Sequence, residues 1–309
     1  MGLGGFGANH LRVLKQLGEQ QACDLTGVVD IRHDRLTSES VEGLRVGTKL
    51  DTFLDDCDAV DVVTPTDTHY GIVERCLSAG KDVFVEKPLA LRSSEASKLV
   101  ELAQKNERIL AVGHILRYHP CISKVKSIVR RDGLGPLKLL DGRYLGTRGP
   151  RTDSGVLMNL AIHLVDLYNF LLEENPKEVS AYLHQLSNAS RFEDHAVLTL
   201  TYPSGSVGHM TVSWLSAQKT REILVAGDSG ALCADLVRSE LVMSEKSSPA
   251  ETAMTISGAE PLLSELTDFI NCLGTRAKPL NDGKSAVVSI RILEKAHEAN
   301  ELGRPVTLD

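Results

Sequence analysis

The residues Gly2-Leu3-Gly4-Gly5-Phe6-Gly7 stand at the start of the 309-residue chain and carry the spacing Gly-x-Gly-x-x-Gly. In a dinucleotide-binding fold the first glycine makes a tight turn, the second lets the backbone approach a pyrophosphate, and the third lets a helix pack closely on a strand. Leu11, Leu14 and Leu17 follow at helical spacing, so a helix is predicted to begin near Ala8 with phosphate at its N-terminus. An ordinary loop is the alternative interpretation. The predicted dinucleotide contacts are Gly2, Gly4, Gly5, Phe6 and Gly7.

Asp30 ends the next predicted strand, residues 25–30, at about the distance of 20 residues where an acidic side chain binds the ribose 2′-hydroxyl. A turn residue at a strand end is the alternative interpretation of Asp30. Arg32 is a candidate for holding the 2′-phosphate of NADP. Because Asp30 would repel that phosphate, the two residues favour NAD as the cofactor and leave NADP as the second choice.

Strand-like and helix-like segments alternate through the first third of the chain. Strands are predicted near residues 58–65, 81–86 and 109–114, with helices near 68–79 and 93–106 between them. This alternation predicts βαβ units, and hence an α/β fold with a Rossmann-like parallel sheet that helices cover on both faces.

Polar residues follow two of these strands, at the carboxyl ends where such sheets bind ligands. Helix capping or a structural role is the simpler interpretation of each residue in 64–69 taken singly. A lone lysine such as Lys87 is usually a solvated surface charge, but Pro88 makes its turn rigid and is a candidate for a cis peptide bond. The candidates for cofactor contact are Thr64, Pro65, Thr66, His69, Glu86 and Lys87.

The pattern changes after about residue 117. Helices are predicted at 120–131 and 155–172, followed by three strand-rich segments that indicate an antiparallel sheet in a second domain. We therefore predict a dinucleotide-binding domain over residues 1–118 and a second domain over 119–309. Residues 244–260 are predicted to be a loop. The strand-rich segments are 178–185, 196–214 and 220–243.

The helix predicted over residues 155–172 places Asn159, His163 and Asp166 on one face. A histidine on an otherwise apolar face is either a ligand-binding group or a core residue whose ring is satisfied by a neighbour, here Asp166. The segment by itself favours the core histidine.

Composition excludes several function classes. The chain has 34 Lys plus Arg against 41 Asp plus Glu and only 4% aromatic residues, which argues against binding of nucleic acid. The six cysteines are scattered, with no pair at metal-binding spacing, so we predict no metal site and reduced thiols in the cytoplasm. The most apolar stretch, residues 156–172, is too short and too polar to cross a membrane.

Taken together, the motifs resemble those of the Gfo/Idh/MocA oxidoreductase family along most of the chain. The resemblance rests on the glycine loop, on T-P-T-D-T-H, on A-G-K-D-V-F-V-E-K-P-L-A (79–90), on V-G-H-I-L-R-Y-H-P (112–120) and on the 155–166 helix. It implies that Lys87 and His163 are catalytic, with His163 as general base and Lys87 hydrogen-bonded to the reacting oxygen. It also implies that residues 119–309 form a substrate and oligomerisation domain with an open, mostly antiparallel sheet, whose C-terminal helices pack back towards the first domain. The expected assembly is a homo-oligomer, a dimer or a tetramer. The family often has Asp where this chain has Asn159.

Within the family, residues 113–120 and 146–151 resemble those of UDP-N-acetylglucosamine 3-dehydrogenases and their relatives. The resemblance implies hydride transfer between NAD and a secondary alcohol of a sugar or sugar nucleotide, with the 3-hydroxyl of a UDP-N-acetylhexosamine as the preferred substrate group. An inositol or free-sugar dehydrogenase is one alternative, and a non-catalytic NAD-responsive regulator is another. Surface arginines are the alternative interpretation of the arginine candidates for a diphosphate. The candidate substrate residues are Arg117, Tyr118, Arg148, Arg151, Asn159, His163 and Asp166.

One feature conflicts with an ordinary dinucleotide fold: a first strand, typically of about 5–6 residues, should precede the glycine loop. Only Met1 precedes Gly2 here. In the strand order 3-2-1-4-5-6 the first strand is central, and without it buried backbone groups would lose their partners. We therefore expect the first strand to be missing from the sheet, and a native N-terminal segment of roughly 5–10 residues to be absent from this sequence, on the prior for strand length.

Overall fold

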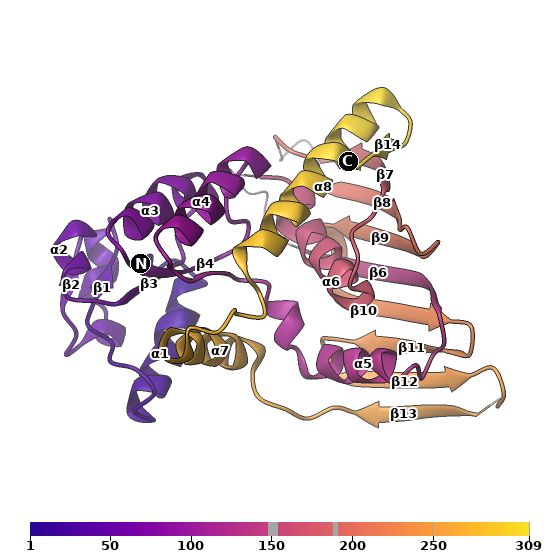
Figure 1. Cartoon of the computed structure of the whole chain (residues 1–309), viewed down its shortest axis with the longest axis horizontal. Coiled ribbons are helices and arrows are strands. Elements are labelled where there is room, and N and C mark those ends of the chain that lie inside the picture. Colours follow the sequence, from indigo (N-terminus) through magenta and orange to yellow (C-terminus); the bar gives the residue numbers. More distant parts are fainter. Residues whose placement is uncertain (148–153, 188–190, 249, 309) are drawn as a thin grey trace. The chain divides into compact units, whose positions relative to one another are not determined.

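The computed structural model describes residues 1–147, 154–187, 191–248 and 250–308, and the chain divides into two compact units. The first unit comprises residues 1–115 and 260–287, and the second comprises 116–259 and 288–309 (Figure 1). None of the described helices is both long enough and apolar enough to cross a membrane.

The first unit is built on parallel strands, as predicted. Strands β3 (Ala59–Val62), β4 (Asp82–Val85) and β5 (Leu110–Val112) form one parallel sheet in that order, and helices α3 (Thr66–Ser78) and α4 (Ser93–Lys105) connect them. All four residues of β4 are buried, which explains its run of apolar residues, because a central parallel strand is covered on both faces.

A second parallel pair, β1 (Val28–Val29) with β2 (Val46–Gly47), is not joined to that sheet by any strand pairing among the described residues. Met1 and Gly2 link the two: the Gly2 N–H donates to the Val29 carbonyl at 2.8 Å, and the Val63 N–H donates to the Met1 carbonyl at 2.7 Å. A cavity of about 770 Å³ lies beside these two residues, which form part of its lining. The sheet is therefore interrupted where its first strand was expected. The cavity lining includes Leu11, Leu14, Val28, Val60, Leu266, Phe269 and Leu273.

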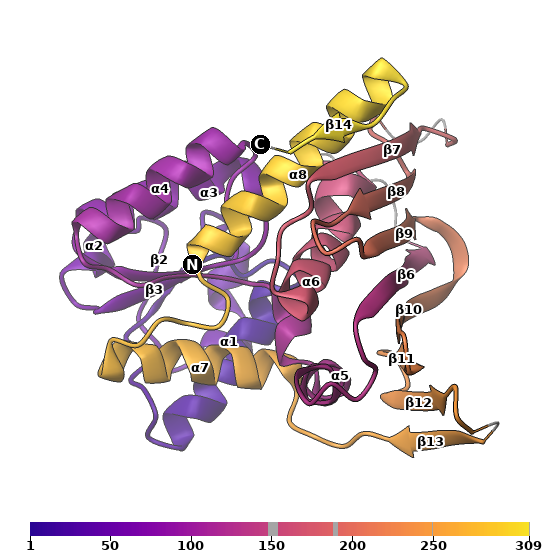
Figure 2. The same ribbon diagram turned by 45° about the vertical axis from the view of Figure 1, so that its right-hand side comes forward.

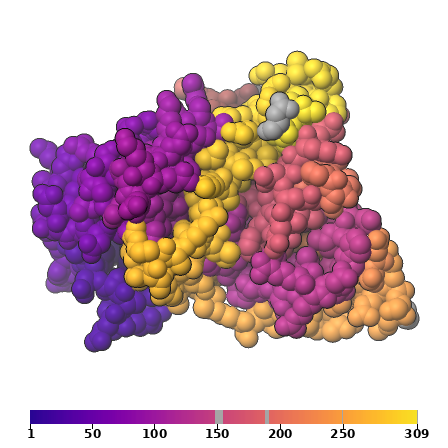
Figure 3. Space-filling view, viewed as in Figure 1, coloured from indigo at the N-terminus to yellow at the C-terminus, as the bar shows by residue number. Residues whose placement is uncertain are grey.

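Helix α7 (Pro261–Thr275) returns from late in the chain to the first unit, where it packs beside α1 (Gly7–Glu19) (Figure 1). Its apolar face joins the core formed by α1 and β4, and the rings of Phe84 and Phe269 meet edge to face at 5.6 Å. In the space-filling view the golden residues of this late segment lie against the N-terminal residues of the same unit (Figure 3).

The second unit contains a nine-stranded sheet that is mostly antiparallel, as predicted, with β6 and β9 as its parallel pair. Helices α5 (Pro120–Arg130) and α6 (Ile162–Leu172) lie on one face of this sheet (Figures 1 and 2). In sheet order the strands are β13 (Glu251–Thr255), β12 (Glu240–Glu245), β11 (Gly230–Asp235), β10 (Leu215–Gly227), β6 (Leu137–Thr147), β9 (Val207–Ser213), β8 (His195–Thr201), β7 (Glu178–His184) and β14 (Val306–Thr307).

Two glycines allow α6 to approach the sheet closely. A Cβ at Gly142 on β6 would come within 2.5 Å of the Tyr168 hydroxyl, and one at Gly208 on β9 within 2.7 Å of the Tyr168 ring. Tyr168 is fully buried, and its hydroxyl donates to the His209 carbonyl at 2.7 Å. This anchored helix carries His163 in its first turn.

Several elements differ from the predictions. Residues 251–255 form β13 inside the predicted loop, because the polar segment Glu-Thr-Ala-Met-Thr pairs with β12 at an exposed sheet edge. The strand predicted at 25–30 is confined to β1. A π-helical turn, Leu157–Ala161, precedes α6 within the predicted single helix. Helix α8 (Gly283–Leu302) belongs to both units, since the division falls between residues 287 and 288.

Candidate active site

Two glycines of the loop are required by its backbone. Gly2 has a φ of +91°, and a Cβ there would lie 2.4 Å from the Val63 carbonyl oxygen. A Cβ at Gly7 would lie 2.0 Å from the Gly2 carbonyl oxygen, so the third glycine lets α1 begin against the loop. By contrast, an added Cβ at Gly5 would meet no atom within 4 Å. The loop therefore has no room for side chains at Gly2 and Gly7, where it packs against the protein, and it has open space at Gly5.

The N-terminus of α1 fits the pyrophosphate of a dinucleotide. Phe6 occupies the N-cap position without a side-chain cap, and the first turn of α1 contains no acidic residue. The helix therefore presents the positive end of its dipole with no competing carboxylate of its own. Gly4 and Gly5 leave room beside it, and Phe6 is 43% exposed.

Asp30 connects β1 to the glycine loop. Its carboxylate accepts hydrogen bonds from the backbone N–H of Leu3 at 2.7 Å, from that of Arg32 at 2.8 Å and from Nη1 of Arg35 at 3.1 Å. Burial opposes ionisation, but these donors outweigh it and hold the pKa of Asp30 below its ordinary value. The Arg32 guanidinium pairs instead with Asp34, at 2.6 Å. The anion at Asp30 would repel a 2′-phosphate, which supports NAD over NADP.

Two strand-end turns are tied together by His69, which is 1% exposed. Its ring nitrogens lie 2.7 Å from the Pro88 carbonyl oxygen and 2.9 Å from that of Thr64, and burial lowers its pKa. The Lys87–Pro88 peptide bond is cis. His69 therefore fixes the turn that carries Lys87. Cofactor contact by His69, Thr64, Pro65 and Thr66 stays a prediction.

A buried polar cluster that the sequence did not reveal lies beside Lys87. Nδ1 of His10 on α1 is 2.9 Å from a carboxylate oxygen of Asp61, and Nε2 is 3.3 Å from one of Glu86. The other oxygen of Glu86 accepts the Lys87 N–H at 3.2 Å. Glu265 on α7 is fully buried nearby in the same unit and accepts a hydrogen bond from Asn281 at 3.0 Å. Because these contacts join residues far apart in sequence, spacing alone could not have found them.

The charges of this cluster predict a loss of stability at alkaline pH. Burial opposes protonation of His10, but Asp61 and Glu86 outweigh it and raise its pKa from 6.5 to about 10. Burial and the neighbouring Glu86 carboxylate raise the pKa of Glu265 as well. The folded state thus binds more protons than the unfolded state, so the contribution of His10 is present below pH 6.5 and disappears as the pH approaches about 10.

We expect the free energy of unfolding to fall between pH 6.5 and 10 by up to about 1.4 kcal/mol per pH unit through His10. Urea unfolding at a series of pH values measures this slope. The slope should become shallower in His10→Gln and stay unchanged in His33→Gln, which alters an exposed histidine of the same unit. Equal slopes in all three proteins would contradict the assigned charge of His10.

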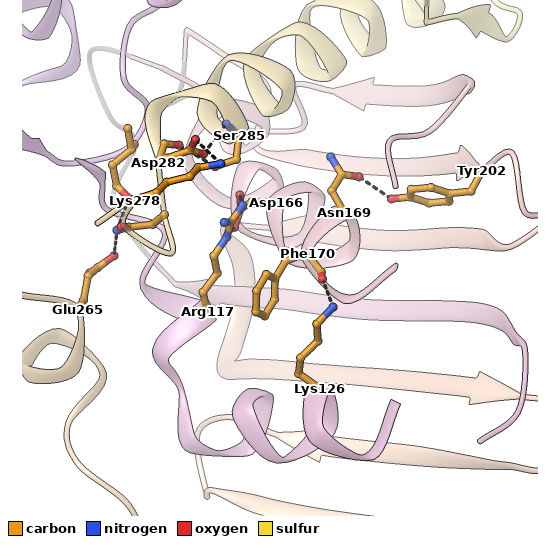
Figure 4. Close-up of polar contacts among 12 residues, drawn as sticks. Arg117, Lys126, Asp166, Asn169, Phe170, Tyr202, Glu265, Lys278, Asp282 and Ser285 are labelled. Carbon is orange, nitrogen blue, oxygen red and sulfur yellow. Dashed lines mark hydrogen bonds and ion pairs between the residues drawn. The ribbon is translucent and has the colours of Figure 1, made fainter. Parts of the chain in front are cut away.

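In the second unit, Asp166 pairs with Arg117. Nε of Arg117 donates to one carboxylate oxygen at 2.8 Å and Nη2 donates to the other at 2.5 Å (Figure 4). Both side chains are almost fully buried, and the Arg117 guanidinium lies 5.2 Å from the centre of the Phe170 ring. Such a bidentate pair fixes the first two turns of α6 in place. It also neutralises Arg117, which makes this residue a poor candidate for binding a diphosphate.

Three of the remaining predicted substrate residues lie within the described part of the chain, and two lie outside it. Asn159 lies in the π-helical turn with its amide nitrogen 3.4 Å from the Ser154 hydroxyl, and His163 is 8% exposed. Tyr118 ends the short helix Ile115–Tyr118. Arg148 and Arg151 lie outside the described residues. An orienting contact from Asp166 to His163 stays a prediction.

Comparison with known proteins agrees with this geometry. The family model described as an oxidoreductase family with an NAD-binding Rossmann fold matches residues 1–114, and that of the GFO/IDH/MocA C-terminal domain matches residues 122–233. The UDP-N-acetylglucosamine 3-dehydrogenase of Acidithiobacillus ferrooxidans is 28% identical over 306 residues, which cover 96% of this chain and 95% of that protein.

Two further similarities extend along the chain. A solved structure of the Acidithiobacillus enzyme superposes with a TM-score of 0.87 at 26% identity, covering 97% of this chain and 96% of the other. The myo-inositol 2-dehydrogenase of Thermotoga maritima is 26% identical over 332 residues, covering 100% of this chain and 97% of that protein. The predicted family is confirmed: the chain belongs to the Gfo/Idh/MocA family of oxidoreductases, and its first unit is an NAD-binding Rossmann domain.

Proposed function

We propose that this protein is an NAD-dependent dehydrogenase that oxidises a secondary alcohol of a sugar nucleotide, preferably the 3-hydroxyl of a UDP-N-acetylhexosamine. The observation that carries the proposal is the match over almost the whole chain to a UDP-N-acetylglucosamine 3-dehydrogenase. Lys87 and His163 stand at the positions to which the family resemblance assigns catalysis. The turn that holds Lys87, fixed by His69, and the anchored helix that holds His163 support it.

In this proposal, NAD would supply the acceptor for the hydride that the carbinol carbon loses on oxidation. His163 takes the hydroxyl proton as general base, so that the oxygen can form a carbonyl as the hydride leaves. The Lys87 ammonium group donates a hydrogen bond to that oxygen and stabilises its developing negative charge. Asn159 binds a neighbouring hydroxyl group. Asp166 and Arg117 hold the turn of α6 that carries His163.

Binding of the cofactor is assigned to the glycine loop and to Asp30. The open side of the loop at Gly4 and Gly5 and the N-terminus of α1 would hold the pyrophosphate. The Asp30 carboxylate, which now accepts hydrogen bonds from Leu3 and Arg35, would accept hydrogen bonds from the adenosine ribose. The Arg117–Asp166 pair leaves Arg148 and Arg151 as the candidates for the substrate diphosphate.

Two finer properties are also proposed. The six cysteines are free thiols, which fits a cytoplasmic location. The sheet of the second unit exposes large side chains such as Tyr182, which is 66% exposed, and we assign to this sheet the contacts of a homodimer or homotetramer.

A substrate panel tests the function. NADH formation should be fastest with UDP-N-acetylglucosamine, with kcat/KM at least about 10-fold above that for myo-inositol or glucose, because a missing nucleotide removes binding energy. Replacing NAD with NADP should lower kcat/KM by about 10-fold or more, because Asp30 repels the 2′-phosphate.

Turnover of myo-inositol alone would assign the protein to the inositol dehydrogenases, the second candidate, which the full-length match to the Thermotoga enzyme favours. Cofactor binding without turnover of any sugar would instead indicate a regulator.

A further inference from the structure

Beside His163, two residues outside the predicted site form a stack with it. The imidazole ring of His163 lies nearly parallel to the ring of Tyr144, with 5.2 Å between ring centres and an angle of 14° between the planes. Over the same tyrosine ring lies the guanidinium of Arg221, whose Cζ is 3.4 Å from the ring centre. Tyr144 is therefore in contact with both a catalytic candidate and a fixed cation.

The sheet itself builds this arrangement. Tyr144 on β6 and Arg221 on β10 are direct cross-strand partners, so their side chains leave the sheet on the same face. Along β10 that face continues with Ile223 and Val225, which are buried, and along β6 with Gly142, against which α6 packs. The stack thus sits on the helix-covered face, next to the first turn of α6.

The position of Arg221 is fixed independently of Tyr144. Its Nη1 donates to the backbone carbonyl of Leu145 and, at 2.7 Å, to that of Thr220. A guanidinium held in this way keeps its position over the aromatic ring, which a flexible lysine reproduces poorly.

We infer that Tyr144 and Arg221 are positioning residues for His163, in that Arg221 holds the Tyr144 ring and the ring holds the plane of the imidazole. This inference rests on the proposed function, in which His163 is the general base. Stacking restricts rotation of the imidazole about its bond to Cβ. Proton transfer depends on such alignment, since a displacement of about 1 Å can cost 100-fold in rate.

Four variants test the inference with UDP-N-acetylglucosamine and NAD. Tyr144→Leu and Arg221→Gln should lower kcat by about 10-fold while KM changes by less than about 2-fold, because alignment and not substrate binding is lost. Tyr144→Phe keeps the ring and should retain kcat within about 2-fold. Arg143→Gln is the matched control, since Arg143 is the exposed neighbour of Tyr144 on β6 and lies on the opposite face of the sheet.

A second measurement separates this inference from the proposed function. In the free protein, the Tyr144 ring should shift the His163 ring-proton NMR signals upfield, with His163→Gln used for assignment. The shift should persist in Tyr144→Phe and disappear in Tyr144→Leu. Unchanged kcat in both Tyr144→Leu and Arg221→Gln, or an unchanged NMR shift in Tyr144→Leu, overturns the inference. Absence of turnover in the wild-type protein, with the NMR shift present, overturns the proposed function instead. Arg221→Gln keeps the test valid if Tyr144→Leu fails to fold.

Discussion

Replacing His163 with alanine is expected to lower kcat by at least about 100-fold, the usual scale for loss of a general base. The side chain is 8% exposed on a helix that Tyr168 and the Arg117–Asp166 pair anchor to its unit, so alanine should remove the proton acceptor while the helix stays in place. Steady-state NADH formation with UDP-N-acetylglucosamine measures the effect, and the melting temperature checks the fold.

His184→Ala provides the matched control, because His184 is an exposed histidine on β7 of the same unit. It should leave kcat unchanged. In the first unit, Lys87→Met should produce a loss comparable to that of His163→Ala, since it removes the cation assigned to the developing oxyanion. Lys105→Met, at the exposed end of α4, should have no effect. Near-wild-type turnover in His163→Ala would mean that another group removes the proton.

The parts of the site that could be predicted from sequence are those set by local backbone geometry. Gly2 and Gly7 are recognisable because any side chain there would collide with the backbone, which gives the loop a fixed spacing. Lys87 is recognisable because Pro88 follows it after a buried strand, and the peptide bond between them is indeed cis. Alternation of strands and helices in the first third was sufficient to predict a parallel sheet.

The parts that could not be predicted depend on contacts between distant residues. His10 meets Asp61 and Glu86, and Tyr144 meets Arg221, only once the sheets have formed. The partner of Asp166 illustrates the same limit. Helical spacing suggested His163 as its neighbour, whereas the ion pair joins Asp166 to Arg117, 49 residues away in sequence. Strand β13 was not predicted, because a polar edge strand lacks the alternation of apolar and polar residues that indicates a strand.

Filling the cavity between β1 and β3 is expected to stabilise the first unit. A six-residue Val- and Ile-rich extension before Met1 would enter the cavity directly, because the Met1 amino group already donates to the Asp61 carbonyl. Burial lowers the pKa of that amino group, and a peptide N–H in its place carries no charge to desolvate. Central parallel strands are apolar on both faces, which matches the leucine, valine and phenylalanine side chains that line the cavity.

The free energy of unfolding is expected to rise, because each fully buried apolar side chain contributes about 1.5–3 kcal/mol against a backbone entropy of about 1–2 kcal/mol per residue. Thermal and urea unfolding measure the gain, and calorimetric titration measures the NAD affinity. That affinity should rise as well, because the extension fixes Gly2 between Val29 and Val63. A Gly- and Ser-rich extension of equal length is the matched control, since it adds chain without apolar surface. Equal stability of the proteins with the two extensions would mean that this cavity does not accommodate an apolar strand between β1 and β3.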